Sequence, residues 1–186
     1  MNSRINRKAQ MQMSVGTIVT IVLLMAVLVL GIVLTQDIFK GAKSAVDLTE
    51  DQLIGEINKL FSEEKKLVIY PGTTEIEMER DKTWGIGIGV RNRLSGTPTA
   101  QNFNYNVSVD DPDIRDNCGI NIHEVETWIR GKSGQGIPLP PGNEVQVEKV
   151  LFDIPENAPL CSIKIRVDIK IEGSTYDQDS FFLTIV

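Results

Sequence analysis

Residues Cys161–Glu172 read CSIKIRVDIKIE, with apolar and polar side chains alternating through the whole segment. Because successive side chains of a β-strand point to opposite faces, this pattern predicts a strand with one buried and one solvated face. A Gly173-Ser174 turn follows, and a second alternation over Phe181–Ile185 predicts a neighbouring antiparallel strand. We therefore expect the C-terminal part of the chain to be a β-domain.

Further strands are expected upstream of this pair. The clearest have a period of two at Trp84–Arg91 and Phe103–Val109. Weaker strand patterns, separated by turn signals rich in Pro and Gly, occur at Leu67–Tyr70, Thr74–Glu79, Ile120–Trp128 and Glu144–Phe152. About seven short antiparallel strands in residues 65–186 predict a mainly β fold, an immunoglobulin-like antiparallel β-sandwich.

One predicted strand has glycine at every second position, in the sequence Gly85-Ile86-Gly87-Ile88-Gly89. It lacks the spacing and the strand-to-helix context of a G-x-G-x-x-G nucleotide loop. Glycines inside a strand often mark a site that another element approaches closely. We expect such an approach here.

The chain has two cysteines, Cys118 and Cys161, both in the predicted β-domain. Each shares the parity of neighbouring apolar residues, so both are expected to point into the core. In an oxidising compartment they would form a disulfide. The alternative is a pair of buried free thiols that act as small apolar side chains.

Little in the sequence indicates catalysis. The one histidine, His123, lies in a predicted strand without a nucleophile-elbow pattern, so we expect no enzyme and no cofactor. Four aspartates between Asp110 and Asp116 offer oxygen ligands for calcium, but Arg115 interrupts them and the EF-hand spacing fails. A solvated, turn-forming loop is the preferred interpretation, and no metal site is expected.

The N-terminal part has a different character. Residues Val15–Leu34 read VGTIVTIVLLMAVLVLGIVL, a run without a charge. As a helix this run would cover roughly the 30 Å of a bilayer's hydrocarbon core, which predicts a transmembrane helix at 14–36. A cleaved secretory signal would have a shorter apolar core and a small-x-small site, which Thr35-Gln36-Asp37 does not offer.

The leader at 1–13 carries Arg4, Arg7 and Lys8 and no acidic residue. The positive-inside rule then places the N-terminus in the cytoplasm and the C-terminal domain outside the cell membrane. The net charge of −6 leaves that domain acidic, which argues against nucleic acid as a partner.

Apolar residues at helical spacing continue beyond the span and predict an amphipathic helical stalk at 37–64. Thr49 and Gln52 form a capping-box pattern, so the helix either runs through or restarts after a bend near Asp47. The apolar stripe could pack against the chain's own β-domain or against the same helix of other copies.

Asn106-Val107-Ser108 is an N-x-S/T sequon, which makes Asn106 a candidate glycosylation site. Tyr105 and Val107 are expected to face the core, so Asn106 should face outward, as glycosylation requires.

Lys8-Ala9-Gln10-Met11, followed directly by the apolar run, resembles the class III signal peptide of archaeal type IV pilins and archaellins. The resemblance implies that a prepilin peptidase cleaves between Ala9 and Gln10. It also implies a β-rich head outside the membrane and N-terminal helices that bundle into a filament core. Ser14 stands where bacterial pilins carry a glutamate.

Two non-enzymatic functions follow as alternatives. The first is a pilin-like structural subunit of a surface filament, which self-assembles through its N-terminal helix. The second is an uncleaved single-pass protein, held in membrane lipid, whose β-sandwich binds a partner or ligand. Loops at 110–117 and 131–141 are the candidate contact surfaces, since sandwich loops commonly bind partners.

Overall fold

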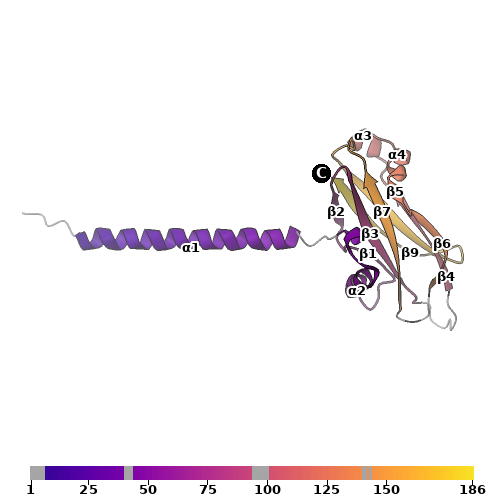
Figure 1. Ribbon diagram of the computed structural model, residues 1–186, viewed down its shortest axis with the longest axis horizontal. Coiled ribbons are helices and arrows are strands. Elements are labelled where there is room, and N and C mark those ends of the chain that lie inside the picture. Colours follow the sequence, from indigo (N-terminus) through magenta and orange to yellow (C-terminus); the bar gives the residue numbers. More distant parts are fainter. Residues whose placement is uncertain (1–6, 40–43, 94–100, 140–141, 143) are drawn as a thin grey trace, which may run out of the picture. The chain divides into compact units, whose positions relative to one another are not determined.

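The computed structural model describes residues 7–39, 44–93, 101–139, 142 and 144–186, and Figure 1 shows its elements. In the first helix, side chains are described for residues 16–32. The chain divides into two compact units, Met1–Gly41 and Ala42–Val186. The first contains helix α1 (Arg7–Phe39), and we call the second the head.

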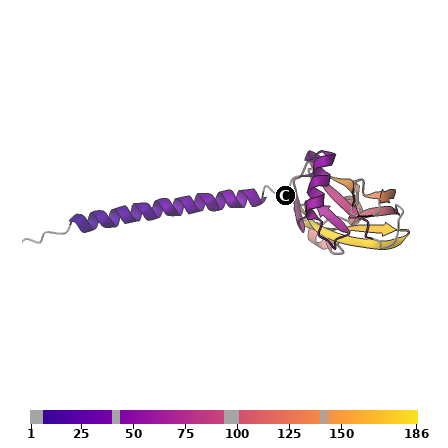
Figure 2. The ribbon, with the colours of Figure 1, turned by 90° about the horizontal axis from the view of Figure 1, so that it is seen from below.

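The head is mainly β and consists of two sheets that share a core (Figures 1 and 2). Sheet A has the strand order β1 (Leu67–Tyr70), β3 (Lys82–Arg91), β7 (Val145–Ile154) and β5 (Ile129–Arg130). Sheet B has the order β2 (Glu75–Met78), β9 (Ser174–Ile185), β8 (Ser162–Ile171), β4 (Gln101–Val109) and β6 (Ser133–Leu139). This architecture confirms the predicted β-sandwich in its coarse form.

The core lies between the two sheets. Alternate residues of β8 from Ile163 to Ile169 have no exposed surface, and the polar residues between them are partly exposed. Phe152 of sheet A meets Phe181 of sheet B edge to face, with ring centroids 6.1 Å apart. The prediction of one buried and one solvated face for this strand is confirmed.

The predicted strand at Ile120–Trp128 is wrong. Its residues form helix α4 (Ile122–Thr127), which follows helix α3 (Ile114–Cys118). The Asn121 side chain accepts a hydrogen bond from Glu124 N–H at 2.9 Å, so asparagine caps the helix start. This local bond satisfies a backbone donor that a strand would direct to a neighbour.

Two strand pairings also differ from expectation. The segment 131–141, expected to be a loop, contains β6, which pairs antiparallel with β4. The short strand β2 pairs parallel, not antiparallel, with the C-terminal end of β9. Both pairings join segments distant in sequence, and local periodicity contains no signal for them.

The glycines of β3 lie beneath another element, as predicted. A Cβ added to Gly85 would lie 2.9 Å from the backbone nitrogen of Val46. Added to Gly87 or Gly89, it would lie 2.8 or 2.3 Å from carbon atoms of Ile57. The absence of side chains on this face of β3 therefore lets residues 44–61 lie directly on sheet A.

Residues 44–61 comprise a 3₁₀ turn, η1 (Ala45–Asp47), and helix α2 (Glu50–Leu60). The predicted capping box is confirmed, since Thr49 and Gln52 bond reciprocally at the start of α2. The buried Ser44 hydroxyl accepts a hydrogen bond from Gly85 N–H at 2.8 Å.

The predicted stalk at 37–64 is therefore corrected. The chain divides after Gly41, and α2 belongs to the compact head, where it contacts β1, β3 and β7. Its buried residues Leu53 and Ile57 cluster with Tyr70 of β1. The apolar stripe of α2 thus packs against the chain's own β-domain, which was the first of the two predicted alternatives.

Replacing Gly89 by alanine should destabilise the head, because the new methyl would overlap Ile57 and force α2 to shift. Overpacking of this kind costs about 1–3 kcal/mol. Gly55→Ala is the matched control, since nothing lies within 4 Å of its Cβ position and alanine favours the helix by about 0.5–1 kcal/mol. Urea unfolding of the purified chain should give changes of opposite sign. Equal stabilities for the two variants would contradict the close packing of α2 on β3.

Candidate functional site

Helix α1 presents an apolar surface on every side. All of its described side chains, from Gly16 to Ile32, are exposed, and the large apolar ones among them are 48–68% exposed. A helix that is apolar around its full circumference is stable only when its surroundings are apolar as well. This surface is the strongest candidate for an interaction site in the chain.

Within the part of the chain that the structure describes, no helix combines the length and hydropathy needed to span a membrane. The predicted span at 14–36 extends to both sides of 16–32, into positions whose side chains lie outside the described residues. The candidate cleavage residues Lys8, Ala9 and Gln10 lie on the helical backbone of α1, and their side chains also lie outside the described set.

The two cysteines form the predicted disulfide. Cys118, at the end of α3, is bonded to Cys161, with their Cα atoms 5.6 Å apart. Cys118 is buried in the core cluster and Cys161 packs against it. The bond ties the helical segment between β4 and β5 to the start of β8.

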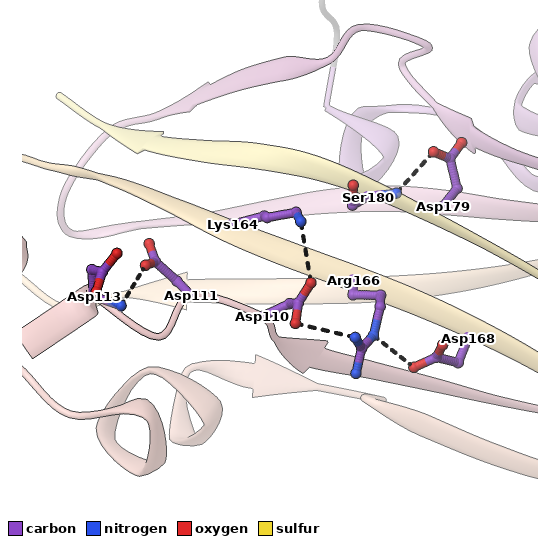
Figure 3. Close-up of polar contacts among 8 residues, drawn as sticks. All are labelled: Asp110, Asp111, Asp113, Lys164, Arg166, Asp168, Asp179 and Ser180. Atoms are coloured by element: carbon purple, nitrogen blue, oxygen red, sulfur yellow. Dashed lines mark hydrogen bonds and ion pairs between the residues drawn. The ribbon is translucent and has the colours of Figure 1, made fainter.

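A cluster of charges lies on the solvated face of sheet B, where β4 ends beside β8 (Figure 3). The Asp110 carboxylate receives Lys164 Nζ at 3.2 Å on one oxygen and Arg166 Nη1 at 3.1 Å on the other. Arg166 Nε reaches Asp168 at 3.1 Å. These side chains are 19–41% exposed, so each pair contributes at most about 1 kcal/mol.

This arrangement does not favour a calcium site. Both oxygens of Asp110 are directed to cationic side chains, and Asp111 Oδ1 accepts a bond from Asp113 N–H at 3.1 Å. Asp116 lies on α3. Among the described residues, no group of three or more His, Cys, Asp or Glu side chains is placed to hold a metal ion.

His123 is exposed on α4, not in a strand as predicted. Perturbed acid–base groups lie elsewhere in the head. Hydrogen bonds from Arg130 and then Thr83 hold the pKa of Asp153 below its usual value. Burial raises the pKa of Tyr105, and so does the charge of Glu148. Asp153 of β7 links β3 and β5 through these bonds, and the Tyr105 hydroxyl donates to Gly131 C=O at 2.9 Å, so both groups have structural roles.

The sequon residue Asn106 is exposed on β4, as its parity predicted. A hollow of about 360 Å³ beside it is lined by polar groups of three strands, among them Ser133 of β6 and Asp168 of β8. The position is therefore accessible to modification.

Sequence reasoning missed the Asp110 cluster as a unit. The alternating charges of β8 placed Lys164 and Arg166 on the solvated face, but Asp110 was assigned to a separate loop. Only the antiparallel pairing of Val109 with Ile165 brings Asp110 beside them.

No family model matches the chain, and no curated protein matches it. Among solved structures, a Niemann-Pick type C2 protein from Japanese carpenter ant is 13% identical, with a TM-score of 0.39, over 66% of this chain and 90% of its own. A CARDB domain from Pyrococcus furiosus, in complex with di-metal ions, is 16% identical, with a TM-score of 0.40, over 69% and 97%. A human PapD-like domain is 14% identical, with a TM-score of 0.38, over 64% and 83%. Similarity this low supports no statement about ligand or activity.

Proposed function

We propose that this chain is a non-enzymatic cell-surface protein, anchored in the membrane by α1, and that it is a pilin-like structural subunit of a surface filament. The observation that carries the proposal is the exposed apolar surface of α1 from Gly16 to Ile32. In water that surface would be unfavourable by roughly 25 cal/mol for each Å². Lipid tails, or the same helices of other copies, are the surroundings that suit it.

Two features support an orientation with the head outside. The basic leader with Arg4, Arg7 and Lys8 suits the cytoplasmic side by the positive-inside rule. The Cys118–Cys161 disulfide suits an oxidising compartment, where such bonds persist. The basic leader and the disulfide therefore both favour a cytoplasmic N-terminus and a head on the other side of the membrane.

The immunoglobulin-like assignment of the head is part of the proposal. The orders β1-β3-β7-β5 and β9-β8-β4 correspond to the A-B-E-D and G-F-C sheets of that fold. The disulfide differs, because it joins α3 to the start of β8, whereas antibody domains link strands B and F across the sheets. A β-sandwich is a suitable head for a surface protein, since the loops at its ends tolerate sequence changes and can bind partners.

Processing of the leader is the step that separates a filament subunit from a permanent anchor. Cleavage after Ala9 by a prepilin peptidase would remove the three basic side chains and leave α1 at the new N-terminus. The apolar helix could then leave the lipid and pack among helices of other copies. With the leader retained, the same helix would stay in the bilayer.

Mass spectrometry of the N-terminus in native membranes tests this step, with electron microscopy of the cell surface as the second readout. The wild type and Ala9→Ser, which keeps a small residue, should both begin at Gln10 and give filaments. Ala9→Phe should retain the leader and give none. An intact leader in the wild type would contradict the proposal of a filament subunit. The remaining alternative would be an uncleaved single-pass protein whose head binds a partner.

A further inference from the structure

The strand β9 is longer than the strand that covers its outer side. On one side it pairs with β8 from Ser174 to Thr184. On the other side β2 pairs with it only at Phe182–Ile185. Among the described residues, no strand pairs with 174–181 on this second side, which we call the free edge of β9.

The backbone N–H groups of Gln178 and Ser180 point out of the free edge. Phe182 N–H donates to Thr74 C=O on the β2 side of β9. Backbone groups of alternate residues in a strand point to the same side, so Ser180 and Gln178 direct their N–H groups to that side as well. An uncovered strand with such donors is a template for pairing with another chain.

Each of these N–H groups donates a hydrogen bond to the side chain of the preceding residue. Gln178 N–H donates to Asp177 Oδ1 at 2.9 Å. Ser180 N–H donates to Asp179 Oδ1 at 2.8 Å, and Figure 3 shows this bond. The same bond therefore occurs at Gln178 and at Ser180, the two alternate positions nearest to the segment that β2 covers.

The free edge also borders a recess whose lining combines polar residues, among them Lys65 and Thr73, with apolar ones. A hollow of about 250 Å³ lies between β1 and β9, with Asp179, Ser180 and Phe181 on one wall. Val68 and Ile69 of β1 and Leu60 of α2 also line it. A strand added to β9 would find the two backbone donors and, beside them, a recess that can hold a side chain, so an open edge would favour association.

We infer that Asp177 and Asp179 close the free edge of β9 and so prevent heads of neighbouring copies from pairing strand to strand. The partner excluded is a second copy of this chain, joined through antiparallel β9 strands. The register that we propose has its two-fold axis at Gln178, so that this residue lies opposite its own copy and every other contact occurs twice. The effect of Asp177 and Asp179 depends only on the head, so the inference does not require that the chain builds a filament.

The test uses the purified full chain in a mild detergent, with self-association measured by analytical ultracentrifugation. Any association through α1 is common to all variants and sets the baseline. Asp177→Ala with Asp179→Ala removes both caps. Asp177→Asn with Asp179→Asn is the matched control, because it removes the charges but retains side-chain oxygens that accept the same bonds.

The alanine variant should associate at least about tenfold more tightly than the wild type, since two freed donors gain partners. The asparagine variant should behave as the wild type. Adding Gln178→Cys to the alanine variant should give a crosslinked dimer, because paired strands bring opposite Cα atoms to about 5.5 Å. Leu160→Cys, at an exposed position outside the free edge of β9, should give none.

Three results would overturn the inference. If the folded alanine variant self-associates no more than the wild type, the two aspartates do not prevent pairing of the edge. Association of both variants would assign the protection to charge repulsion. Association without the crosslink at position 178 would place the contact elsewhere. If the double alanine variant does not fold, the single variants Asp177→Ala and Asp179→Ala are measured instead, each expected to show a smaller increase.

Discussion

Replacing Leu24 and Leu28 of α1 by arginine is expected to release the chain from the membrane. Both side chains are exposed, at 68% and 61%, on the apolar helix that we propose to lie in lipid. Each arginine near the centre of a span costs about 3 kcal/mol relative to leucine on insertion scales, so the pair should abolish stable insertion. Separation of membrane and soluble fractions after an alkaline carbonate wash measures the effect.

The matched control replaces the same two residues by isoleucine, which keeps the apolar surface and should remain in the membrane fraction. The head should keep its disulfide in both variants, since the chain divides after Gly41. Retention of the double arginine variant in washed membranes would show that lipid does not surround α1. The anchor would then have to be sought elsewhere in the chain.

Removing the disulfide should cause the largest loss of stability in the head. Cys118 and Cys161 are separated by 43 positions, and closing a loop of that size restricts the unfolded chain by on the order of 4 kcal/mol. Alanine at both positions avoids leaving a free thiol. The free energy of unfolding of the purified chain, from urea titration under oxidising conditions, should fall by about this amount.

A reducing agent supplies an internal control. It should lower the stability of the wild type towards that of the double alanine variant and leave the variant unchanged. Leu160→Ala, next to Cys161 but 64% exposed, should stay within about 0.5 kcal/mol of the wild type. A variant without the disulfide that is as stable as the wild type would mean that the helical segment at 114–127 is held by packing alone.

The prediction of the sandwich depended on patterns that extend over a few residues. The alternation in β8 was predictive because burial of one face of a strand requires a period of two. The glycines of β3 signalled a covered face, since no side chain occupies that space. The capping box at Thr49 and Gln52 depends on contacts within one helical turn.

The candidate sites divide in the same manner. The apolar surface of α1 and the exposure of Asn106 could be predicted from composition and from strand parity. Parity also predicted that both cysteines face the core, where Cys118 is buried and Cys161 packs against the core cluster. The Asp110 cluster and the caps at Asp177 and Asp179 were missed. The first depends on which strands are neighbours, and the second on how far β2 extends along β9.

The β character of the head and the start of α2 could be predicted from sequence, because alternation and capping involve near neighbours in the chain. The apolar character of α1 follows directly from its composition. Three features became known from the folded chain alone: α2 lies on the glycines of β3, β2 joins β9 in parallel, and part of β9 has a free edge. These features depend on which distant segments meet. Many pairings satisfy the same local patterns, and the packing of the whole core selects among them.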